Sequence, residues 1–255
     1  MSLGSIDWTI LWPACVAGLL ITATHVPLGT QVLDRGIVFI DLAIAQIAGL
    51  GVVFADYLGL EPQGWAVQAC ALAAALAGAL LLTWTDKRWP EVQEAMIGVT
   101  FVVAASAALL LLASNPHGGE HLRELLIGQI LWVTPARLPL PAIVYALLLA
   151  VMLARRDWSA RAPFYLIFAC AVTISVQLVG LYLVFTTLIV PALATRRLRR
   201  YRMAAAYALS AAGYVLGLVV SSLTDVPSGP AIVCVMAMLA IPVFAATSRF
   251  ARAAP

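Results

Sequence analysis

Long apolar stretches separated by short polar connections dominate the chain. They run from Trp8 to Leu33, Pro62 to Thr85, Ala95 to Gly119, Leu138 to Ala154, Ala162 to Thr195, Met203 to Thr224 and Val226 to Ser248, and a further stretch, Ile37 to Ala55, is interrupted only by Asp41. A bilayer core about 30 Å thick needs roughly 20 apolar residues per helix. The pattern therefore predicts a polytopic helical membrane protein.

The stretch from Ala162 to Thr195 is too long for one ordinary span, because a single helix of that length would measure about 50 Å. Arginine-rich connections flank both of its ends. We therefore expect a span followed by a return, in which "GLYLVFTTLIVPALA" forms a short or broken helix near Gly180 and Pro191. The predicted fold is all-α, with about eight full transmembrane segments and one short returning segment, in a single transmembrane domain over residues 1–255.

Composition supports this class. Of the 255 residues, 63% are hydrophobic and 11% are charged, which excludes an ordinary soluble domain. The first cationic residue is Arg35, so the basic start of a cleaved signal peptide is missing and we expect the first apolar stretch to be retained. The four cysteines fall singly in different apolar stretches, a spacing that predicts packing residues rather than disulfides or a CxxC metal site.

The charges of the connections predict the topology. Basic residues gather in Asp34-Arg35, "TDKRWP", "ARRDWSARAP" and "TRRLRRYR", whereas "ADYLGLEPQG", "SNPHGGEH" and "LTDVPSG" hold few or none. Because short basic loops remain on the cytoplasmic side, we expect the N-terminus outside and the C-terminus inside.

Three polar residues in the apolar stretches are candidates for a translocation pathway: Asp41, Gln46 and His25. Ionisable groups in membrane helices tend to face the bundle interior or a hydrated path. Asp41 has a second, local interpretation, in which it complements the start of a helix and pairs with Arg35. Gln46, among small residues, either joins helices or contacts substrate. His25 precedes Pro27, where we expect the first helix to kink or end, and it is either a packing residue or part of the path.

A predicted outer loop, "SNPHGGEHLRELL", contains His117, Glu120 and His121. Imidazole and carboxylate groups suit zinc or manganese, so these residues either contact a metal transiently or belong to an ordinary solvated loop. No catalytic motif is present, and with Lys87 as its only lysine the chain cannot contain a Walker A loop. We expect a transporter subunit rather than an enzyme, with ATP hydrolysis in a partner and no role for nucleic acid.

Four segments resemble the zinc and manganese branch of ABC-transporter permeases, the ABC-3 family, in order and spacing. They are "HVPLGTQVLDRGIVFIDLAIAQIAGLG", "LLIGQILWVTPARL", "VGLYLVFTTLIVPALATRRL" and "GLVVSSLTDVPSGPAIVC". The resemblance implies a fold like that of cobalamin and siderophore importer permeases. It also implies a homodimer of permeases in membrane lipid, two cytoplasmic ABC ATPase subunits and an extracytoplasmic metal-binding protein.

The resemblance gives one loop a role and leaves one motif incomplete. It implies contact with the ATPase for Arg155, Arg156, Asp157 and Arg161. Family members commonly carry Asp and then His in the second segment, near "GD-x-L-x-H", where this chain has Asp41 and, five positions later, Gln46. An amide is a poorer zinc ligand than imidazole.

The expected function is the membrane subunit of an ATP-driven importer of a divalent metal, zinc ahead of manganese, in the bacterial cytoplasmic (inner) membrane. No permanently bound cofactor is expected, because the metal is the cargo. Two alternatives stay open: an ABC permease for a metal chelate or other small solute, and a secondary transporter driven by an ion gradient, with Asp41 as its proton or sodium site.

Overall fold

The computed structural model describes residues 8–60, 64–112, 130–154, 161–198 and 200–253, and within them it contains helices and no strand. The long helices are α1 (Trp8–Arg35), α2 (Ile40–Tyr57), α3 (Trp65–Arg88), α4 (Gln93–Leu112), α6 (Pro139–Ala154), α7 (Arg161–Val179), α8 (Leu181–Thr195), α9 (Arg202–Thr224) and α10 (Ser228–Ala253). Short 3-10 turns η2 (Pro90–Val92), η3 (Ile130–Trp132) and η4 (Pro135–Arg137) precede α4 and α6.

Eight segments in the described ranges are long and apolar enough to cross a bilayer, and α8 is a shorter apolar helix. This arrangement confirms the predicted eight full segments and one short one. The exposed side chains of these helices are largely apolar, including Leu110, Leu153 and Ile241. An apolar outer surface is what a helix bundle surrounded by lipid requires.

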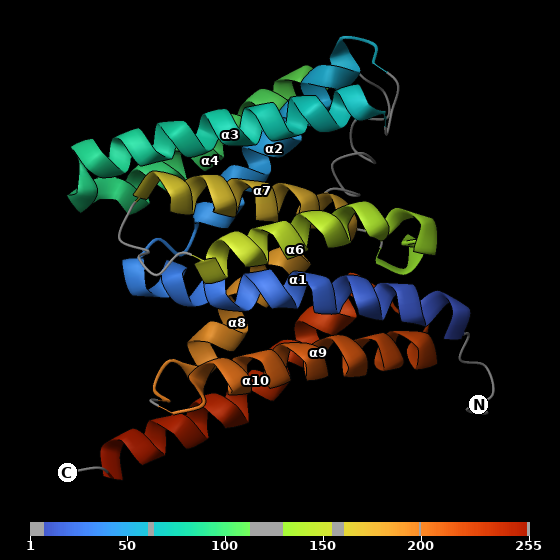
Figure 1. Ribbon diagram of the computed structural model, residues 1–255, viewed down its shortest axis with the longest axis vertical. Coiled ribbons are helices and arrows are strands. Elements are labelled where there is room, and N and C mark those ends of the chain that lie inside the picture. The colour runs from blue at the N-terminus through green and yellow to red at the C-terminus, as the bar shows by residue number, and fades with distance from the viewer. Residues whose placement is uncertain (1–7, 61–63, 113–129, 155–160, 199, 254–255) are drawn as a thin grey trace.

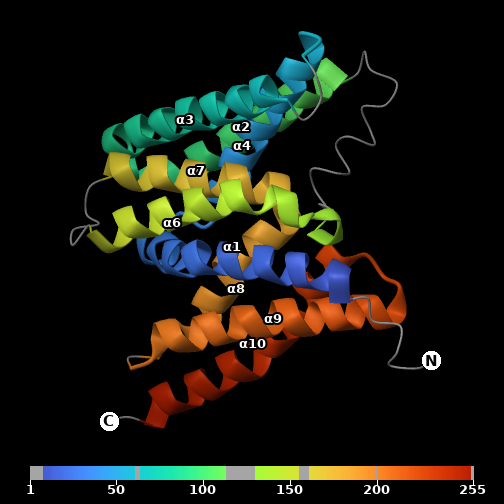
Figure 2. The same ribbon diagram turned by 45° about the vertical axis from the view of Figure 1, so that its right-hand side comes forward.

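The return after α7 depends on one glycine. α7 ends at Val179 and α8 begins at Leu181, so Gly180 alone reverses the chain. Its φ of 83° and ψ of 161° lie in a region that is essentially restricted to glycine. α8 then runs back towards the end of the bundle where α7 began (Figures 1 and 2). The predicted span and return is therefore confirmed.

The helices form two groups (Figure 1). α2 packs against α3, α4 and α7, whereas α1 packs mainly against α8 and α9, and α10 covers α8 and α9. α7 and α8 join the two groups through the Gly180 turn. As a consequence, the first two helices of the chain lie mostly in different groups.

α1 passes through Pro27 and continues to Arg35, so of the kink or end expected there, the end does not occur. Pro27 cannot bond the carbonyl of Ala23, four residues earlier. The Tyr207 hydroxyl of α9 donates to that carbonyl oxygen at 3.0 Å. The partner from α9 satisfies the carbonyl group, which allows the helix to continue.

Helix contacts at glycines hold the α1–α8–α9–α10 group together. A Cβ added at Gly217 would lie 2.5 Å from the Ile232 Cα of α10, and one added at Gly213 would lie 2.9 Å from Met236. This glycine pair therefore allows α9 and α10 to pack closely. A Cβ at Gly29 of α1 would overlap the Leu188 carbonyl oxygen of α8, so these two backbones are in direct contact.

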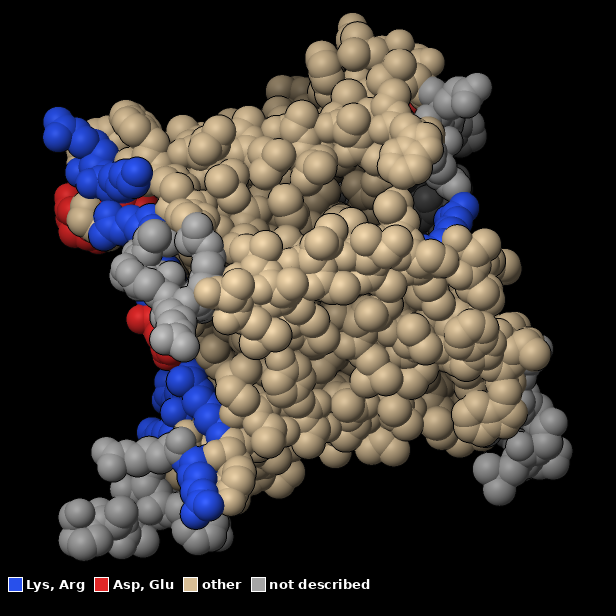
Figure 3. Space-filling model, viewed as in Figure 1, with Lys and Arg blue, Asp and Glu red and all other residues tan. Residues whose placement is uncertain are grey.

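Most of the basic side chains visible in Figure 3 gather at one end of the bundle. Two ion pairs tie helix ends together there: Arg161 Nε lies 3.1 Å from Asp86 Oδ2, and Arg202 Nη2 lies 3.4 Å from Asp34 Oδ1. We call this the basic end. It contains the end of α1, the end of α3 and the starts of α7 and α9, as the charge pattern predicted.

Candidate functional site

Asp41 is a fully buried carboxylate near the start of α2. It is the second residue of the helix and has no exposed surface, and neither of its side-chain oxygens has a hydrogen-bond partner among the residues that the structure describes. Asp41 lies in the first turn of α2, as its local interpretation expected, but the pairing with Arg35 is not formed, and the Arg35 guanidinium lies 4.3 Å from the centre of the Phe164 ring. Burying a carboxylate without a partner costs free energy. Helix packing alone therefore does not explain why an aspartate occupies this position.

Gln46 does not share a face with Asp41. Five residues along a helix with 3.6 residues per turn correspond to a rotation of about 140°, whereas the spacing of four in the family motif places both residues on one side. Ala45 is the residue of this chain four positions after Asp41, and it is buried. The small residues around Gln46 admit a neighbouring helix, since a Cβ at Gly51 would lie 2.7 Å from the Cys70 carbonyl oxygen of α3.

His25 lies in the other helix group, on α1. Its side chain is fully buried, and Nδ1 lies 3.1 Å from both the Ile21 carbonyl oxygen and the Thr24 hydroxyl oxygen. Nε2 has no hydrogen-bond partner among the described residues. Ten residues separate His25 from Arg35, so it lies about 15 Å from the basic end. No hydrogen bond joins it to Asp41.

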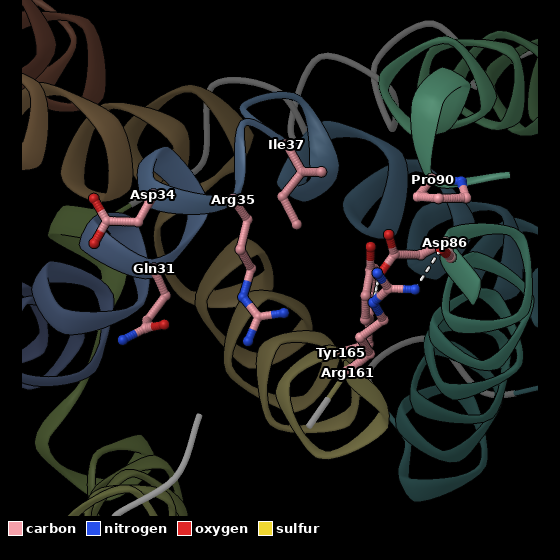
Figure 4. Close-up of a pocket in the computed structure, with 8 residues that line it drawn as sticks. All are labelled: Gln31, Asp34, Arg35, Ile37, Asp86, Pro90, Arg161 and Tyr165. Atoms are coloured by element: carbon pink, nitrogen blue, oxygen red, sulfur yellow. Dashed lines mark hydrogen bonds and ion pairs between the residues drawn. The ribbon is translucent and has the colours of Figure 1, made fainter. Parts of the chain in front are cut away.

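A cavity of about 570 Å³ opens at the basic end beside the start of α2. Figure 4 shows its lining residues, which come from α1, α3, α7 and the connections that follow α1 and α3: Gln31, Asp34, Arg35, Ile37, Asp86, Pro90, Arg161 and Tyr165. Ile37 lies one helical turn before Asp41 in the chain. The cavity therefore brings charged side chains of both signs close to the helix that carries the buried carboxylate.

Arg161, an expected ATPase-contacting residue, is bound to α3. Besides its ion pair with Asp86, its Nη1 donates to the Asp86 carbonyl oxygen at 2.6 Å. The bidentate contact fixes the first residue of α7 against the last turn of α3. Asp86 was not predicted as a site residue, although its place in "TDKRWP" marks it as the acidic residue of a basic loop.

One turn further along α7, the buried Tyr165 reaches α4. The Gln93 Nε2 donates to the Tyr165 hydroxyl at 3.1 Å and to the Leu82 carbonyl oxygen of α3 at 3.0 Å, and the Gln93 Oε1 accepts from the Thr85 hydroxyl at 2.9 Å. We call Thr85, Asp86, Gln93, Arg161 and Tyr165 the polar cluster. It joins α3, α4 and α7 at the basic end.

The residue after Gln93 extends these contacts to α2. The Glu94 carboxylate accepts a hydrogen bond from the backbone N–H of Phe39 at 3.4 Å. Phe39 is the N-cap residue of α2, two positions before Asp41. A carboxylate at a helix N-terminus is electrostatically favourable, and here it comes from α4. The start of α7 is thus connected through α4 to the start of α2.

Several predicted residues lie outside the described residues: His117, Glu120 and His121 in the outer loop, and Arg155, Arg156 and Asp157 before α7. Within the described ranges, no group of three or more His, Cys, Asp or Glu side chains is placed to hold a metal ion. Asp41, Gln46 and His25 do not form a preassembled metal site there.

Comparisons with known proteins agree with this architecture. The family model of the ABC 3 transport family matches residues 7–162 and 159–247. The structure of PsaBC from Streptococcus pneumoniae in complex with Fab has a similar fold, with a TM-score of 0.70, 21% identity and coverage of 92% of this chain and 90% of that one. A metal-chelate type ABC transporter in an inward-facing conformation gives a TM-score of 0.66 and 15% identity, covering 93% of this chain and 85% of that one.

Proposed function

The chain belongs to the ABC 3 transport family, and from this premise we propose that it is the permease subunit of an ATP-driven importer of a divalent metal, zinc ahead of manganese. Two copies would surround the pathway in the bacterial cytoplasmic membrane. Separate ATPase subunits would bind the basic end, and an extracytoplasmic protein would deliver the ion. Alternating access would then carry the ion past Asp41.

The observation that carries this proposal is the buried Asp41 carboxylate. Ionisable groups inside membrane helices are retained where they serve a path for ions or protons. A divalent cation passing Asp41 would supply the charge that this carboxylate lacks in the described structure. Gln46 and His25 lie farther from the basic end along α2 and α1, and they are proposed as polar contacts that an imported ion meets before Asp41 rather than as ligands held together with it.

The polar cluster supports a route by which ATP hydrolysis reaches Asp41. Under the proposal, the ATPase contacts the segment from Arg155 to Arg161. Movement of Arg161 is passed to α3 through Asp86, and movement of Tyr165 is passed to α4 through Gln93. Glu94 then carries the displacement to the N-terminus of α2.

We expect Tyr165→Phe to lower the number of ions transported per ATP hydrolysed by about threefold to fivefold. The change removes only the hydroxyl that Gln93 contacts, and one buried hydrogen bond contributes about 1 kcal/mol. Tyr145→Phe is the matched control, because Tyr145 is equally buried and makes one interhelical bond, 2.6 Å to the Ser175 hydroxyl, away from the polar cluster. Equal transport-to-hydrolysis ratios in the two variants would exclude the polar cluster from coupling.

The proposed function is tested by co-expressing the permease with its ATPase. We expect a stable complex whose ATP hydrolysis in nanodiscs rises when the metal-loaded delivery protein is added. The proposal would be rejected if the permease formed no complex with the ATPase. It would also be rejected if the rate of ATP hydrolysis by the complex did not change when the metal-loaded delivery protein was added.

A second candidate substrate is a metal chelate. Two observations favour it: neither Ala45, four positions after Asp41, nor Gln46 supplies the histidine of the family motif, and one structurally similar protein is described as a metal-chelate type transporter. Metal content and growth of a zinc-starved deletion strain separate the two. Rescue by free zinc supports the first proposal, and rescue only by a chelated metal supports the second.

A further inference from the structure

Three arginines beside the turn between α8 and α9 lie over aromatic rings rather than beside carboxylates. The guanidinium carbons of Arg196 and Arg197 lie 5.7 and 5.8 Å from the centre of the same ring, Phe244 of α10. The guanidinium carbon of Arg200 lies 4.9 Å from the ring centre of Tyr201. Two cations share one aromatic surface here, and a third lies close by in the chain.

These three arginines differ from Arg161 and Arg202 at the basic end, although Arg35 and Arg88 also lie against aromatic rings, Phe164 and Trp89. Arg161 and Arg202 are ion-paired with Asp86 and Asp34, whereas no acidic side chain of the described residues pairs with Arg196, Arg197 or Arg200. Because both guanidinium carbons lie 5.7 and 5.8 Å from one ring centre, two positive charges are concentrated at one place on the surface. Such a concentration of positive charge attracts an anion.

We call Arg196, Arg197 and Arg200 the arginine patch. The position of the patch indicates where that anion comes from. Phe244 lies in the last turns of the apolar span Ser228–Thr247, and the Thr247 hydroxyl donates to the Ala194 carbonyl oxygen at 3.2 Å, which fixes α10 against the end of α8. Phe244 and Tyr201 are 36% and 67% exposed. Exposed aromatic side chains at the end of a span are typical of the headgroup region of a membrane.

An apolar stripe leads away from the arginines along α10. Met238, Ile241 and Phe244 follow at intervals of three residues and are all exposed. Residues at this spacing lie on one side of a helix. The patch thus combines positive charge with a continuous apolar surface, which suits a phospholipid better than a soluble anion or an acidic protein surface.

We propose that Arg196, Arg197 and Arg200 bind the headgroup phosphate of an anionic phospholipid whose acyl chain lies along Met238 and Ile241. The site is separate from the proposed pathway and does not depend on the transported substrate. Its ligand is held by charge and by aromatic contact at the basic end.

The test compares binding of spin-labelled phosphatidylglycerol and phosphatidylcholine to the full chain reconstituted in phosphatidylcholine vesicles. We expect the unmodified protein to immobilise phosphatidylglycerol preferentially, and the double variant Arg196→Gln/Arg197→Gln to lower that preference about threefold to tenfold. The control is Lys87→Gln/Arg88→Gln, which removes the same charge from the end of α3, where only the Arg88 guanidinium lies against a ring, that of Trp89, and it should retain most of the preference. Arg200→Gln, a single change at an exposed residue, serves if the double variant does not fold.

Three other outcomes would overturn the proposal. Equal losses in both double variants would mean general attraction to the basic end. Displacement of the lipid by inorganic phosphate at constant ionic strength would indicate a site for a free anion. An unchanged lipid preference with loss of ATPase binding in Arg196→Gln/Arg197→Gln would assign the patch to the ATPase instead.

Discussion

Asp41→Asn is expected to lower metal uptake about 100-fold, which corresponds to about 2.7 kcal/mol. The amide keeps the volume of the carboxyl group and removes its negative charge. Asp41 has no exposed surface, and charge interactions are stronger in a low-dielectric interior than in water. The measurement is initial uptake into vesicles containing the permease–ATPase complex, with the amount of folded complex determined in parallel.

The control for this change is Asp56→Asn, near the opposite end of the same helix, where the side chain is exposed. It removes the same charge from α2, and its metal uptake should stay within about twofold of that of the unmodified protein. If Asp41→Asn transports as well as the unmodified protein, Asp41 is a residue of helix packing and the pathway lies elsewhere. Equal losses in both variants would point to the overall charge of α2 rather than to the buried site.

Gly29→Ala is expected to destabilise the protein by about 3 kcal/mol, at the upper end of the range for overpacking. The added methyl group would overlap the Leu188 backbone carbonyl, and backbone atoms cannot rotate away as a side chain can. α1 and α8 would have to move apart, and the contact that holds the returning helix α8 in place would be lost. Thermal unfolding in detergent should show a midpoint lower by roughly 5 to 10 °C.

Gly98→Ala in α4 provides the matched control, because a Cβ there would meet nothing within 4 Å. Its unfolding midpoint should stay the same or rise slightly, since alanine favours helix. If Gly29→Ala unfolds at the same temperature as Gly98→Ala, the two helices do not make the close contact described above.

The membrane architecture follows from local properties of the sequence. Apolar length predicts each span, and the arginines on both sides of residues 162–195 predict the return at Gly180, because both basic ends must remain on one side. These signals need no knowledge of which helices touch. They therefore predicted the order of the helices and their direction.

The errors concern contacts between distant residues. Of the kink or end expected at Pro27, the end does not occur, and Tyr207, 184 residues from Ala23 along the chain, donates a hydrogen bond to the carbonyl that Pro27 cannot bond. The Arg35 guanidinium lies over Phe164 rather than pairing with Asp41, since the α7 ring is closer in the folded chain than the sequence suggests. Such partners are set by tertiary packing.

The polar cluster shows the same limit at the candidate site. Tyr165 lies inside an apolar stretch and has no polar neighbour that marks it, and its partner Gln93 is 72 residues away. Asp41 could be predicted as a candidate because a charged residue in an apolar stretch is recognisable from the sequence alone. Its geometry relative to Gln46 became clear only with α2 in place.

The most direct measurement of the central claim is uptake of radioactive zinc into vesicles that contain the permease and its ATPase, with ATP inside and the metal-loaded delivery protein outside. The proposed mechanism predicts uptake that requires ATP hydrolysis and persists when a protonophore collapses the proton gradient. Uptake that continues without ATP and stops with the protonophore would contradict it and identify a transporter driven by an ion gradient.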